Sequence, residues 1–294
     1  MLILKLPVKS GIADLPINRF VAPLYLVVGK PYSIEEVELT GPKANEVLVE
    51  VVATGVCATD AGAAAGHMGV PFPIVLGHEA SGIVQEVGEA VTYVQPGDHV
   101  VIACCLCGFC DNCLTGKPGS CENIPRLNFG GAMEDGTKRL SKDGKEIGTF
   151  FGQSTFATHA VTNEKNLIKI DKDLDLKLFG PLGCGIVTGS ATVLEGLKPK
   201  AGSTIAIYGC GAVGLSAVMA AKIAGCVKII AVDINDSRLE LAKDRKSTPS
   251  QGILGVIGPK RMAYSKTMGL IKYVTQEVNK MLNKTERKDE INGK

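Results

Sequence analysis

The sequence contains no tryptophan, only four histidines, and few aromatic residues, which make up 5% of its 294 residues. It also lacks a charge excess of either sign, because 32 Lys and Arg residues against 30 Asp and Glu residues give a net charge of +2. A chain this close to neutral has no strong electrostatic attraction for nucleic acid or for an acidic membrane. We therefore expect no nucleic-acid partner and no membrane partner.

A secretory signal and a membrane span are also missing from the sequence pattern. The first ten residues have too short an apolar stretch, which Lys5 and Pro7 interrupt, and no small-residue cleavage site. The longest uncharged run, 201–221, contains four glycines and changes from a strand-like to a helix-like period. We expect a cytoplasmic protein, in which the ten cysteines are metal ligands, catalytic groups or buried side chains rather than disulfides.

The chain is long enough for two domains at roughly 100–200 residues each. Short β-branched runs separated by Gly, Pro and Asp over 47–101 predict an antiparallel, β-rich domain. From Ser203 the pattern of strand, glycine turn, helix and strand predicts a βαβ unit of a parallel sheet. The predicted class is α/β plus β, with a β-rich domain over 1–174, a partial parallel-sheet domain over 175–246 and a partly helical, unrelated tail over 247–294.

Four cysteines occur at the spacing of zinc ligands: Cys107, Cys110, Cys113 and Cys121. Thiolates at this spacing can fold a loop around one tetrahedral Zn²⁺, and four of them leave no position for a substrate. The predicted role is therefore structural. One alternative is a set of free or redox-active thiols. Another is a redox sensor formed with Cys104 and Cys105, which would release zinc on oxidation. We interpret Cys104 and Cys105 as residues of a strand core.

A second set of metal-binding residue types is scattered along the chain. Two thiolates, Cys57 and Cys184, and the imidazole of His78 would form a three-ligand zinc site with a position for water or substrate, as in catalytic zinc centres. Spacing alone does not bring Cys184 near the other two residues. Each of them taken singly is better explained by ordinary packing, and only their joint occurrence beside the four-cysteine motif favours a zinc site.

A glycine-rich motif of the form G-x-G-x-x-G follows the predicted strand at 204–208: Gly209, Cys210, Gly211, Ala212, Val213 and Gly214. Its glycines permit a tight turn and close approach of the backbone, and the following helix presents free N–H groups to a pyrophosphate. Asp233 ends the next predicted strand, where an acid meets the ribose hydroxyls of a dinucleotide. The alternative is a glycine-rich turn without a ligand.

Together these features resemble the zinc-containing medium-chain alcohol dehydrogenases. The resemblance rests on GHE at 77–79, the four-cysteine lobe at about 104–122, GPLGCGIVTG at 180–189 and GCGAVG at 209–214 with AVDINDSRLELAK after it. It covers about 31–243 and implies a GroES-like catalytic domain followed by an incomplete Rossmann domain. RLNFGG at 126–131 and FFGQSTFATHAV from Phe150 are most similar to aryl-alcohol (benzyl-alcohol) dehydrogenases.

The resemblance implies a role for each matching residue. Cys57, His78 and Cys184 would bind a catalytic zinc, with Glu79 close behind the metal. Thr59 would take the proton of the alcohol, and Asp60 would accept a hydrogen bond from His78. The residues implied to bind the cofactor are Thr188, Gly209, Gly211, Ala212, Val213, Gly214 and Asp233.

The implied reaction is oxidation of a primary, aromatic alcohol to its aldehyde, with Lewis-acid activation of the alcohol and hydride transfer to NAD. Asp233 favours NAD over NADP, because a carboxylate repels a 2′-phosphate. The resemblance further implies two zinc ions per chain, a small-molecule substrate and a homo-oligomer.

The sequence departs from the family pattern at several positions. Ala58 stands where many members carry a cationic or imidazole residue, and Gly62 stands where some carry a relay histidine. We interpret the remaining histidines as ordinary surface or strand residues: His67, His99 and His159.

Both ends of the chain also fit the family poorly. Residues up to about 22 match it weakly, and the family pattern stops near Asp244, after two strands of the parallel sheet and before the usual dimer edge. The segment from Gly252 to Leu282 resembles the C-terminus of heat-inducible transcription repressors. The simplest interpretation is a truncated dehydrogenase joined to a foreign tail by gene fusion or sequence error. Retained activity and inactivity through truncation are both consistent with this interpretation. The alternative function is a non-catalytic zinc-binding protein with a structural or regulatory role, which tight NAD binding would argue against.

Overall fold

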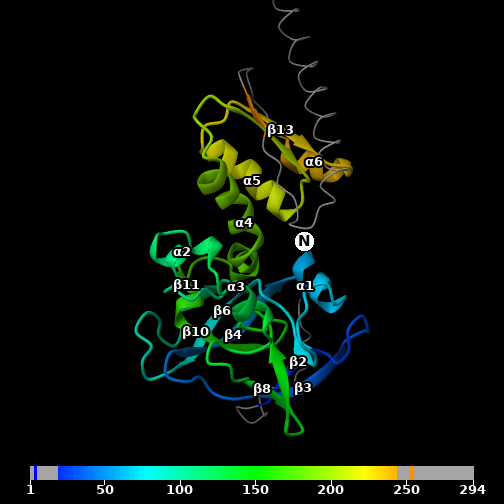
Figure 1. Ribbon diagram of the computed structural model, residues 1–294, viewed down its shortest axis with the longest axis vertical. Helices are drawn as coiled ribbons and strands as arrows, with labels where there is room; N and C mark the ends of the chain where they lie inside the picture. The colour runs from blue at the N-terminus through cyan, green and yellow to red at the C-terminus, as the bar shows by residue number, and fades with distance from the viewer. Residues whose placement is uncertain (1–2, 5–18, 244–251, 255–294) are drawn as a thin grey trace, which may run out of the picture. The chain divides into compact units, whose positions relative to one another are not determined.

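The computed structural model describes residues 3–4, 19–243 and 252–254, which belong to two compact units, Met1–Val187 and Thr188–Lys294 (Figure 1). The division lies inside helix α4 (Gly185–Ala191). The domain boundary that the sequence predicts, between residues 174 and 175, stays a prediction. None of the helices among the described residues is long and apolar enough to cross a membrane.

The first unit contains a six-stranded antiparallel sheet in the order β1, β4, β6, β7, β11, with β10 also paired to β4. Alternating β-branched residues favour these strands because such side chains pack well on a pleated surface. Val47, Val49, Val84 and Ile102 form part of its buried core. The strands are β1 (Ile3–Leu4), β4 (Glu46–Gly55), β6 (Ala80–Val87), β7 (His99–Ile102), β10 (His159–Asn163) and β11 (Leu167–Ile170).

A closed barrel makes up the rest of the β-structure in this unit, in the strand order β2, β3, β8, β9, β5. Its interior is an apolar cluster that includes Ile74, Leu76, Ile147 and Phe150, all nearly inaccessible to solvent. Closure leaves no unpaired edge of the kind that would associate with another chain. The strands are β2 (Arg19–Tyr25), β3 (Ser33–Leu39), β5 (Ile74–Val75), β8 (Leu140–Lys142) and β9 (Lys145–Thr149).

Short helices connect these strands and position the candidate site. Helix α1 begins directly after β4, and helix α3 follows the last cysteine of the four-cysteine motif. The helices of this unit, including 3₁₀ turns, are α1 (Ala58–Ala64), α2 (Asp111–Leu114), η2 (Pro118–Ser120), α3 (Ile124–Phe129), η3 (Glu164–Asn166), η4 (Leu176–Leu178) and η5 (Gly180–Gly183).

A buried ion pair joins the sheet to the barrel. The guanidinium of Arg139, just before β8, donates two hydrogen bonds to the carboxylate of Glu46 at the start of β4, at 2.8 and 2.7 Å. Both residues are buried. Either charge without its partner would lower the stability of the fold, because a buried, unpaired charge is poorly solvated.

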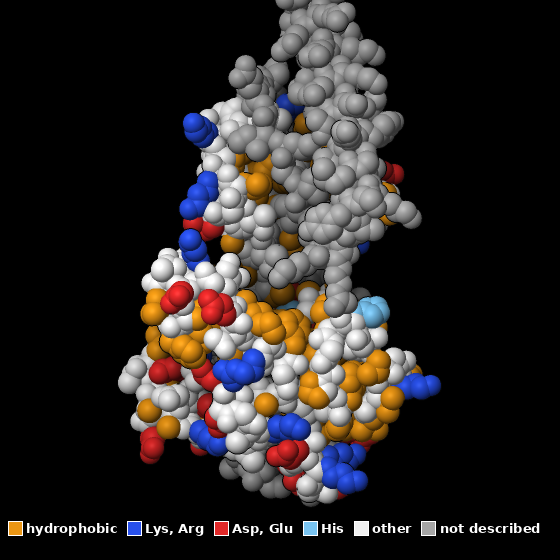
Figure 2. Space-filling model, viewed as in Figure 1, with side chains coloured by type: hydrophobic (Ala, Val, Ile, Leu, Met, Phe, Trp, Pro, Cys, Tyr) orange, Lys and Arg blue, Asp and Glu red, His pale blue; other side chains and the backbone are white. Residues whose placement is uncertain are grey.

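Hydrophobic side chains also occur outside the core. Figure 2 shows them gathered on the side of the first unit where Figure 1 draws β2 and β3. The exposed residues of the connection between these strands include Leu26, Val27, Val28 and Tyr32. Composition alone therefore does not identify the core residues, and burial has to be read from the tertiary structure.

The second unit is a three-stranded parallel sheet in the order β13, β12, β14, with helices between successive strands. The sequence predicted two parallel strands and an unrelated tail from residue 247, but Gly252–Leu254 forms β14 beside β12. The rest of the predicted tail lies outside the described residues. The elements are α4, the π-helix η6 (Thr192–Leu197), β12 (Thr204–Tyr208), α5 (Ala212–Ile223), β13 (Lys228–Val232), α6 (Asp236–Ala242) and β14.

His159 makes the stability of the first unit dependent on pH. Its ring lies 4.4 Å from that of Phe20, and burial lowers its pKa from 6.5 to about 4. As the pH falls from about 6.5 to about 4, the unfolded chain takes up a proton that the folded chain does not. The free energy of unfolding should therefore fall over this range, by about 1 kcal/mol after allowance for solvent screening.

Urea unfolding at a series of pH values tests this expectation with His159→Leu as the variant. The variant should lose that part of the pH dependence, because its side chain does not titrate. His67→Gln, at an exposed histidine, serves as the control and should keep the wild-type slope. An unchanged slope in His159→Leu would contradict the expectation.

Candidate functional site

The structure brings four metal-binding side chains together in the first unit: Cys57, His78, Glu79 and Cys184. One ligand atom from each residue lies within 4.8 Å of the ligand atoms of the other three. Three of these residues were candidates from their residue types, and the resemblance implied the place of Glu79. The pairing of strands explains how residues so far apart in the sequence meet.

Two of these segments meet because β4 and β6 are antiparallel neighbours. Thr54, near the end of β4, pairs with Ala80, the first residue of β6. Cys57 follows that end of β4, whereas His78 and Glu79 directly precede β6. Both segments therefore leave the sheet at the same edge.

Cys184 reaches the same edge through the glycines of η5. A Cβ on Gly180 would lie 2.5 Å from the carbonyl oxygen of Glu79, and one on Gly183 would lie 2.1 Å from the carbonyl oxygen of Ile102. Side chains at these positions would push η5 away from the ends of β6 and β7. The glycines in GPLGCG therefore let the backbone approach closely enough to place Cys184 beside His78.

Asp60 fixes the geometry of Cys57 and His78. Its Oδ2 accepts a hydrogen bond from the backbone N–H of Cys57 at 3.0 Å, which caps the first turn of α1. Its Oδ1 lies 3.0 Å from Nδ1 of His78 and accepts the backbone N–H of Gly77 at 3.0 Å. The Asp60 carboxylate therefore orients the imidazole ring so that Nε2 faces the other donors.

The donor set fits a bound cation. Nε2 of His78 is completely buried and has no hydrogen-bond partner within the described part of the chain. An orphaned nitrogen of this kind is costly unless a ligand satisfies it, and two thiols with a carboxylate lie beside it. Sulfur and imidazole donors are the ligands that Zn²⁺ prefers.

The four groups also shift one another's pKa values. The hydrogen bond from the Cys184 thiol, together with His78, lowers the pKa of Cys57 to about 3, whereas the same pairing raises the pKa of Cys184. Burial acts to lower the pKa of His78, but the hydrogen bond with Asp60 and the negative charges of Asp60 and Cys57 outweigh it and raise that pKa to about 10. Burial and the charge of Cys57 raise the pKa of Glu79.

The raised pKa values of His78 and Cys184 favour the protonated forms of these two groups. A metal ion binds the deprotonated forms of cysteine and histidine, so its binding has to release protons from His78 and Cys184.

Thr59 lies beside the donor set, with its Oγ1 3.6 Å from Sγ of Cys57. Ala58 and Gly62, which replace polar residues of the family pattern, lie on the same short helix. Glu79 is held by the first residue of α4, because its Oε1 accepts the backbone N–H of Gly185 at 3.1 Å. Gly55 leaves room for that carboxylate, since a Cβ there would lie 2.4 Å from Oε2 of Glu79.

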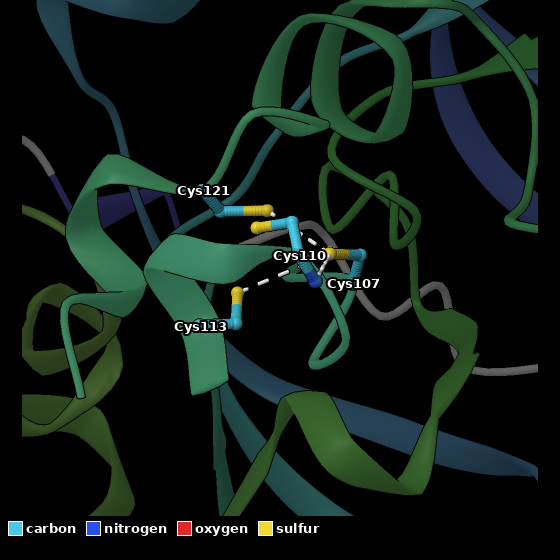
Figure 3. Close-up of side chains that lie close together, drawn as sticks. All are labelled: Cys107, Cys110, Cys113 and Cys121. Atoms are coloured by element: carbon cyan, nitrogen blue, oxygen red, sulfur yellow. Dashed lines mark hydrogen bonds between the residues drawn. The ribbon is translucent and has the colours of Figure 1, made fainter. Parts of the chain in front are cut away.

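The four-cysteine motif forms a second donor cluster, which Figure 3 shows with its thiols directed toward one another. The four Sγ atoms, from Cys107, Cys110, Cys113 and Cys121, lie within 4.8 Å of one another. Sγ of Cys107 is 3.5 Å from that of Cys121 and 3.9 Å from that of Cys113. All ten cysteines of the chain are free thiols.

Cys104 and Cys105 lie outside both donor clusters. The interpretation of them as strand residues is wrong, because β7 ends at Ile102 and both follow it. Cys105 is instead buried in the loop, where Nδ2 of Asn166 donates to its thiol at 3.2 Å. The apolar run continues past Ile102, the last residue of β7 that pairs in the sheet, so it predicted a longer strand than the structure has.

The glycine-rich motif lies between β12 and α5 in the second unit. Gly209 adopts a left-handed conformation with a φ of +87°, and Gly211 is the N-cap of α5. A Cβ on Gly214 would lie 1.7 Å from the carbonyl oxygen of Gly209, so the helix packs against the turn at a distance that only glycine permits. Ala212 and Val213 form the first turn of α5.

Asp233 follows β13 and points toward the glycine turn. Its Oδ2 accepts the backbone N–H of Cys210 at 2.6 Å, and its Oδ1 accepts that of Asn235 at 2.9 Å. These two hydrogen bonds lower the pKa of the Asp233 carboxyl. Thr188 lies on α4 as an exposed residue, with its carbonyl oxygen bonded to Oγ1 of Thr192.

Two aromatic side chains that the sequence had not singled out as site residues contact His78: Phe150 and Phe151. A third, Phe129, contacts both of these rings. Phe151 stacks on the imidazole with ring centroids 4.5 Å apart and an interplanar angle of 27°. Phe150 approaches edge-on at 5.6 Å. The signals in the sequence are RLNFGG at 126–131 and the adjacent pair of phenylalanines at 150–151, both of which resemble the aryl-alcohol sub-family.

Comparison with known proteins gives matches across most of the chain. Residues 43–172 match the alcohol dehydrogenase GroES-like domain. Geraniol dehydrogenase of Castellaniella defragrans is 45% identical over 217 residues, which are 73% of this chain and 58% of that protein. This chain therefore spans less than two thirds of the length of that relative.

Two crystal structures share the fold. The alcohol dehydrogenase zinc-binding domain protein from Burkholderia ambifaria is 43% identical with a TM-score of 0.75, covering 86% of this chain and 67% of its own. Benzyl alcohol dehydrogenase from Acinetobacter calcoaceticus is 43% identical with a TM-score of 0.74, covering 81% of this chain and 64% of its own. With its β-rich GroES-like domain and Rossmann-like unit, the chain belongs to the zinc-type medium-chain alcohol dehydrogenase family.

Proposed function

We propose that this chain acts as a zinc-dependent alcohol dehydrogenase that oxidises a primary aromatic alcohol to the aldehyde with NAD. The observation that carries the proposal is the convergence of Cys57, His78 and Cys184, with Glu79, on one edge of the sheet. Side-chain packing gives no reason for two cysteines and a histidine from three separate segments to meet. Binding of one metal ion does give a reason, because thiolate and imidazole are zinc ligands. The family membership supports an alcohol as the substrate.

Cys57, His78 and Cys184 would hold the zinc ion, with Glu79 beside it. Zinc bound there would supply a Lewis acid that lowers the pKa of an alcohol hydroxyl. Asp60 keeps a proton on Nδ1 of His78 by accepting it in a hydrogen bond, which leaves Nε2 free to act as a ligand. The neighbours of Cys57 favour its thiolate, whereas Asp60 raises the pKa of His78, so zinc would have to displace a proton from that ring.

Thr59 has the position to move the substrate proton. Its hydroxyl lies 3.6 Å from Sγ of Cys57 and is half-buried, so it can accept a proton from one neighbour and donate its own to solvent. The replacement of the usual relay histidine by Gly62 leaves Thr59 as the candidate for this step.

The aromatic rings near His78 support an apolar substrate. Phe150 is fully buried, Phe129 and Phe151 are partly buried, and an aromatic alcohol can pack against such rings by edge-to-face contact. Geraniol and benzyl alcohol, which give two relatives their names, are both unsaturated primary alcohols.

The cofactor is proposed from the second unit. Gly209, Gly211 and Gly214 allow a pyrophosphate to approach the start of α5, and the carboxylate of Asp233 lies next to that turn. NAD bound there would accept the hydride. The negative charge of Asp233 would repel the 2′-phosphate of NADP, so NAD is the expected form.

Metal content per chain and NAD reduction by benzyl alcohol, measured on the same purified sample, test this proposal. We expect two zinc ions per chain and turnover with NAD that exceeds turnover with NADP. Ethanol serves as the control substrate and should react more slowly, because it lacks a ring. Two zinc ions without turnover or NAD binding would instead support a non-catalytic zinc protein.

A further inference from the structure

The imidazole of His78 is held on its face as well as at its edge. Asp60 fixes Nδ1, but a single hydrogen bond leaves the ring able to tilt about that contact. Phe151 covers one face with centroids 4.5 Å apart, and Phe150 closes another side at an interplanar angle of 83°. Because His78 is fully buried, these rings determine the plane in which Nε2 points at the other donors.

Phe151 adopts an unfavourable backbone conformation to make this stack. Its φ is +54°, in the left-handed region that bulky residues avoid. Such a conformation persists only where the surroundings impose it. The turn at 150–154 does so, because the backbone N–H groups of Gln153 and Ser154 donate to the carbonyl oxygen of Phe150 at 3.0 and 2.9 Å.

Helix α3 anchors this strained turn. The backbone N–H of Phe151 donates to the carbonyl oxygen of Asn128 at 3.0 Å. The ring of Phe129, the next residue of α3, lies 5.2 Å from that of Phe151 and 6.0 Å from that of Phe150. The position of Phe151 therefore follows the position of α3.

Helix α3 is in turn attached to the four-cysteine cluster. Leu127 packs in one buried apolar cluster with Cys107 and Cys121, and the backbone N–H of Ile124 donates to the carbonyl oxygen of Cys121. The buried side chain of Asn128 accepts the N–H of Cys105 at 2.9 Å and donates to the carbonyl oxygen of the same residue at 2.9 Å.

We propose that Phe151 is a positioning residue that couples the four-cysteine cluster to His78 through helix α3. The cysteine loop fixes one side of α3. Phe129, the last residue of α3, packs against the ring of Phe151, which orients the imidazole. The four-cysteine cluster then contributes to metal binding at the other donor set, in addition to stabilising its own loop. This inference rests on the proposed role of His78 as a metal ligand.

Cadmium binding to the full chain, followed by ¹¹³Cd NMR, tests the inference without relying on activity. A four-thiolate site and a site with two thiolates and one imidazole give separate signals, so each can be titrated against a chelator. Phe151→Leu should weaken metal binding at the mixed site about 10-fold. Phe151→Tyr keeps the stacked ring and should stay within about 2-fold of wild type.

Two further measurements separate positioning from general packing. Phe20→Leu removes the ring that contacts a different histidine, His159, and should leave both signals unchanged. Asn128→Leu should weaken the mixed site in the wild-type background but add little to Phe151→Leu, because both changes act through the same ring. The four-thiolate signal reports in each variant whether the loop stays folded.

If both cadmium signals are present in the wild type and Phe151→Leu leaves the metal affinity of the mixed site unchanged, the inference is overturned. The proposed function would then still stand. Equal losses in Phe151→Leu and Phe151→Tyr would also overturn it, because the stack would then be irrelevant. Absence of a mixed-site signal from the wild type would instead remove the proposed function, and the inference with it.

Discussion

Replacing Cys57 by serine is expected to reduce NAD reduction by benzyl alcohol at least about 1000-fold while the first unit stays folded. Lewis-acid activation stabilises the transition state by several kcal/mol, and each 1.36 kcal/mol corresponds to a factor of ten in rate. A serine hydroxyl is a poor zinc ligand compared with a thiolate, which Cys57 forms readily because its pKa is lowered to about 3.

The measurement is kcat/KM together with zinc content and a urea unfolding curve. Zinc content should fall from two ions to one, and the unfolding midpoint should change little, since Cys57 lies at the start of a short helix and is only half-buried. Cys104→Ser is the matched control, because Cys104 is also half-buried and belongs to neither donor cluster. Full turnover by Cys57→Ser would show that the catalytic-zinc assignment is wrong.

Replacing Cys110 by serine is expected to have the largest effect on stability. Binding of a structural zinc ion contributes about 10–16 kcal/mol in small zinc domains, which matches or exceeds the total stability of about 5–15 kcal/mol of a typical protein. The loop at 107–121 has only a small apolar cluster of its own, made largely of the cysteines themselves. We expect loss of one zinc ion and a destabilisation of several kcal/mol.

Zinc content, soluble yield and thermal unfolding of Cys110→Ser check this expectation. The matched control is Cys105→Ala, which changes a buried thiol in the same cluster without removing a donor, and should cost about 1 kcal/mol. Normal zinc content with an unchanged melting temperature in Cys110→Ser would argue against a structural metal site. The two serine variants thus separate catalysis from folding.

The glycine turn and the four-cysteine cluster were predictable because their geometry is local. Cys107, Cys110 and Cys113 lie within one short loop, so their spacing alone restricts how far apart the thiols can be. The same holds for Gly209 and Gly211, where a left-handed turn and the start of a helix follow from the residue type. In these segments the amino-acid sequence by itself determined the local geometry.

Other features depend on contacts between distant segments. The meeting of Cys184 with Cys57 requires the pairing of β4 with β6 and the close packing of η5, which no local pattern encodes. The third parallel strand, β14, came from a segment predicted as an unrelated tail, because a three-residue strand is defined by its partner rather than by its own sequence.

The sequence by itself determined the family, the types of donor residue and the local turns that hold them. Only the tertiary structure decided which donors meet, which atom of His78 faces them and which rings fix its plane. The physical reason is that spacing restricts distances within a loop, whereas the relative positions of remote segments follow from strand register and side-chain packing.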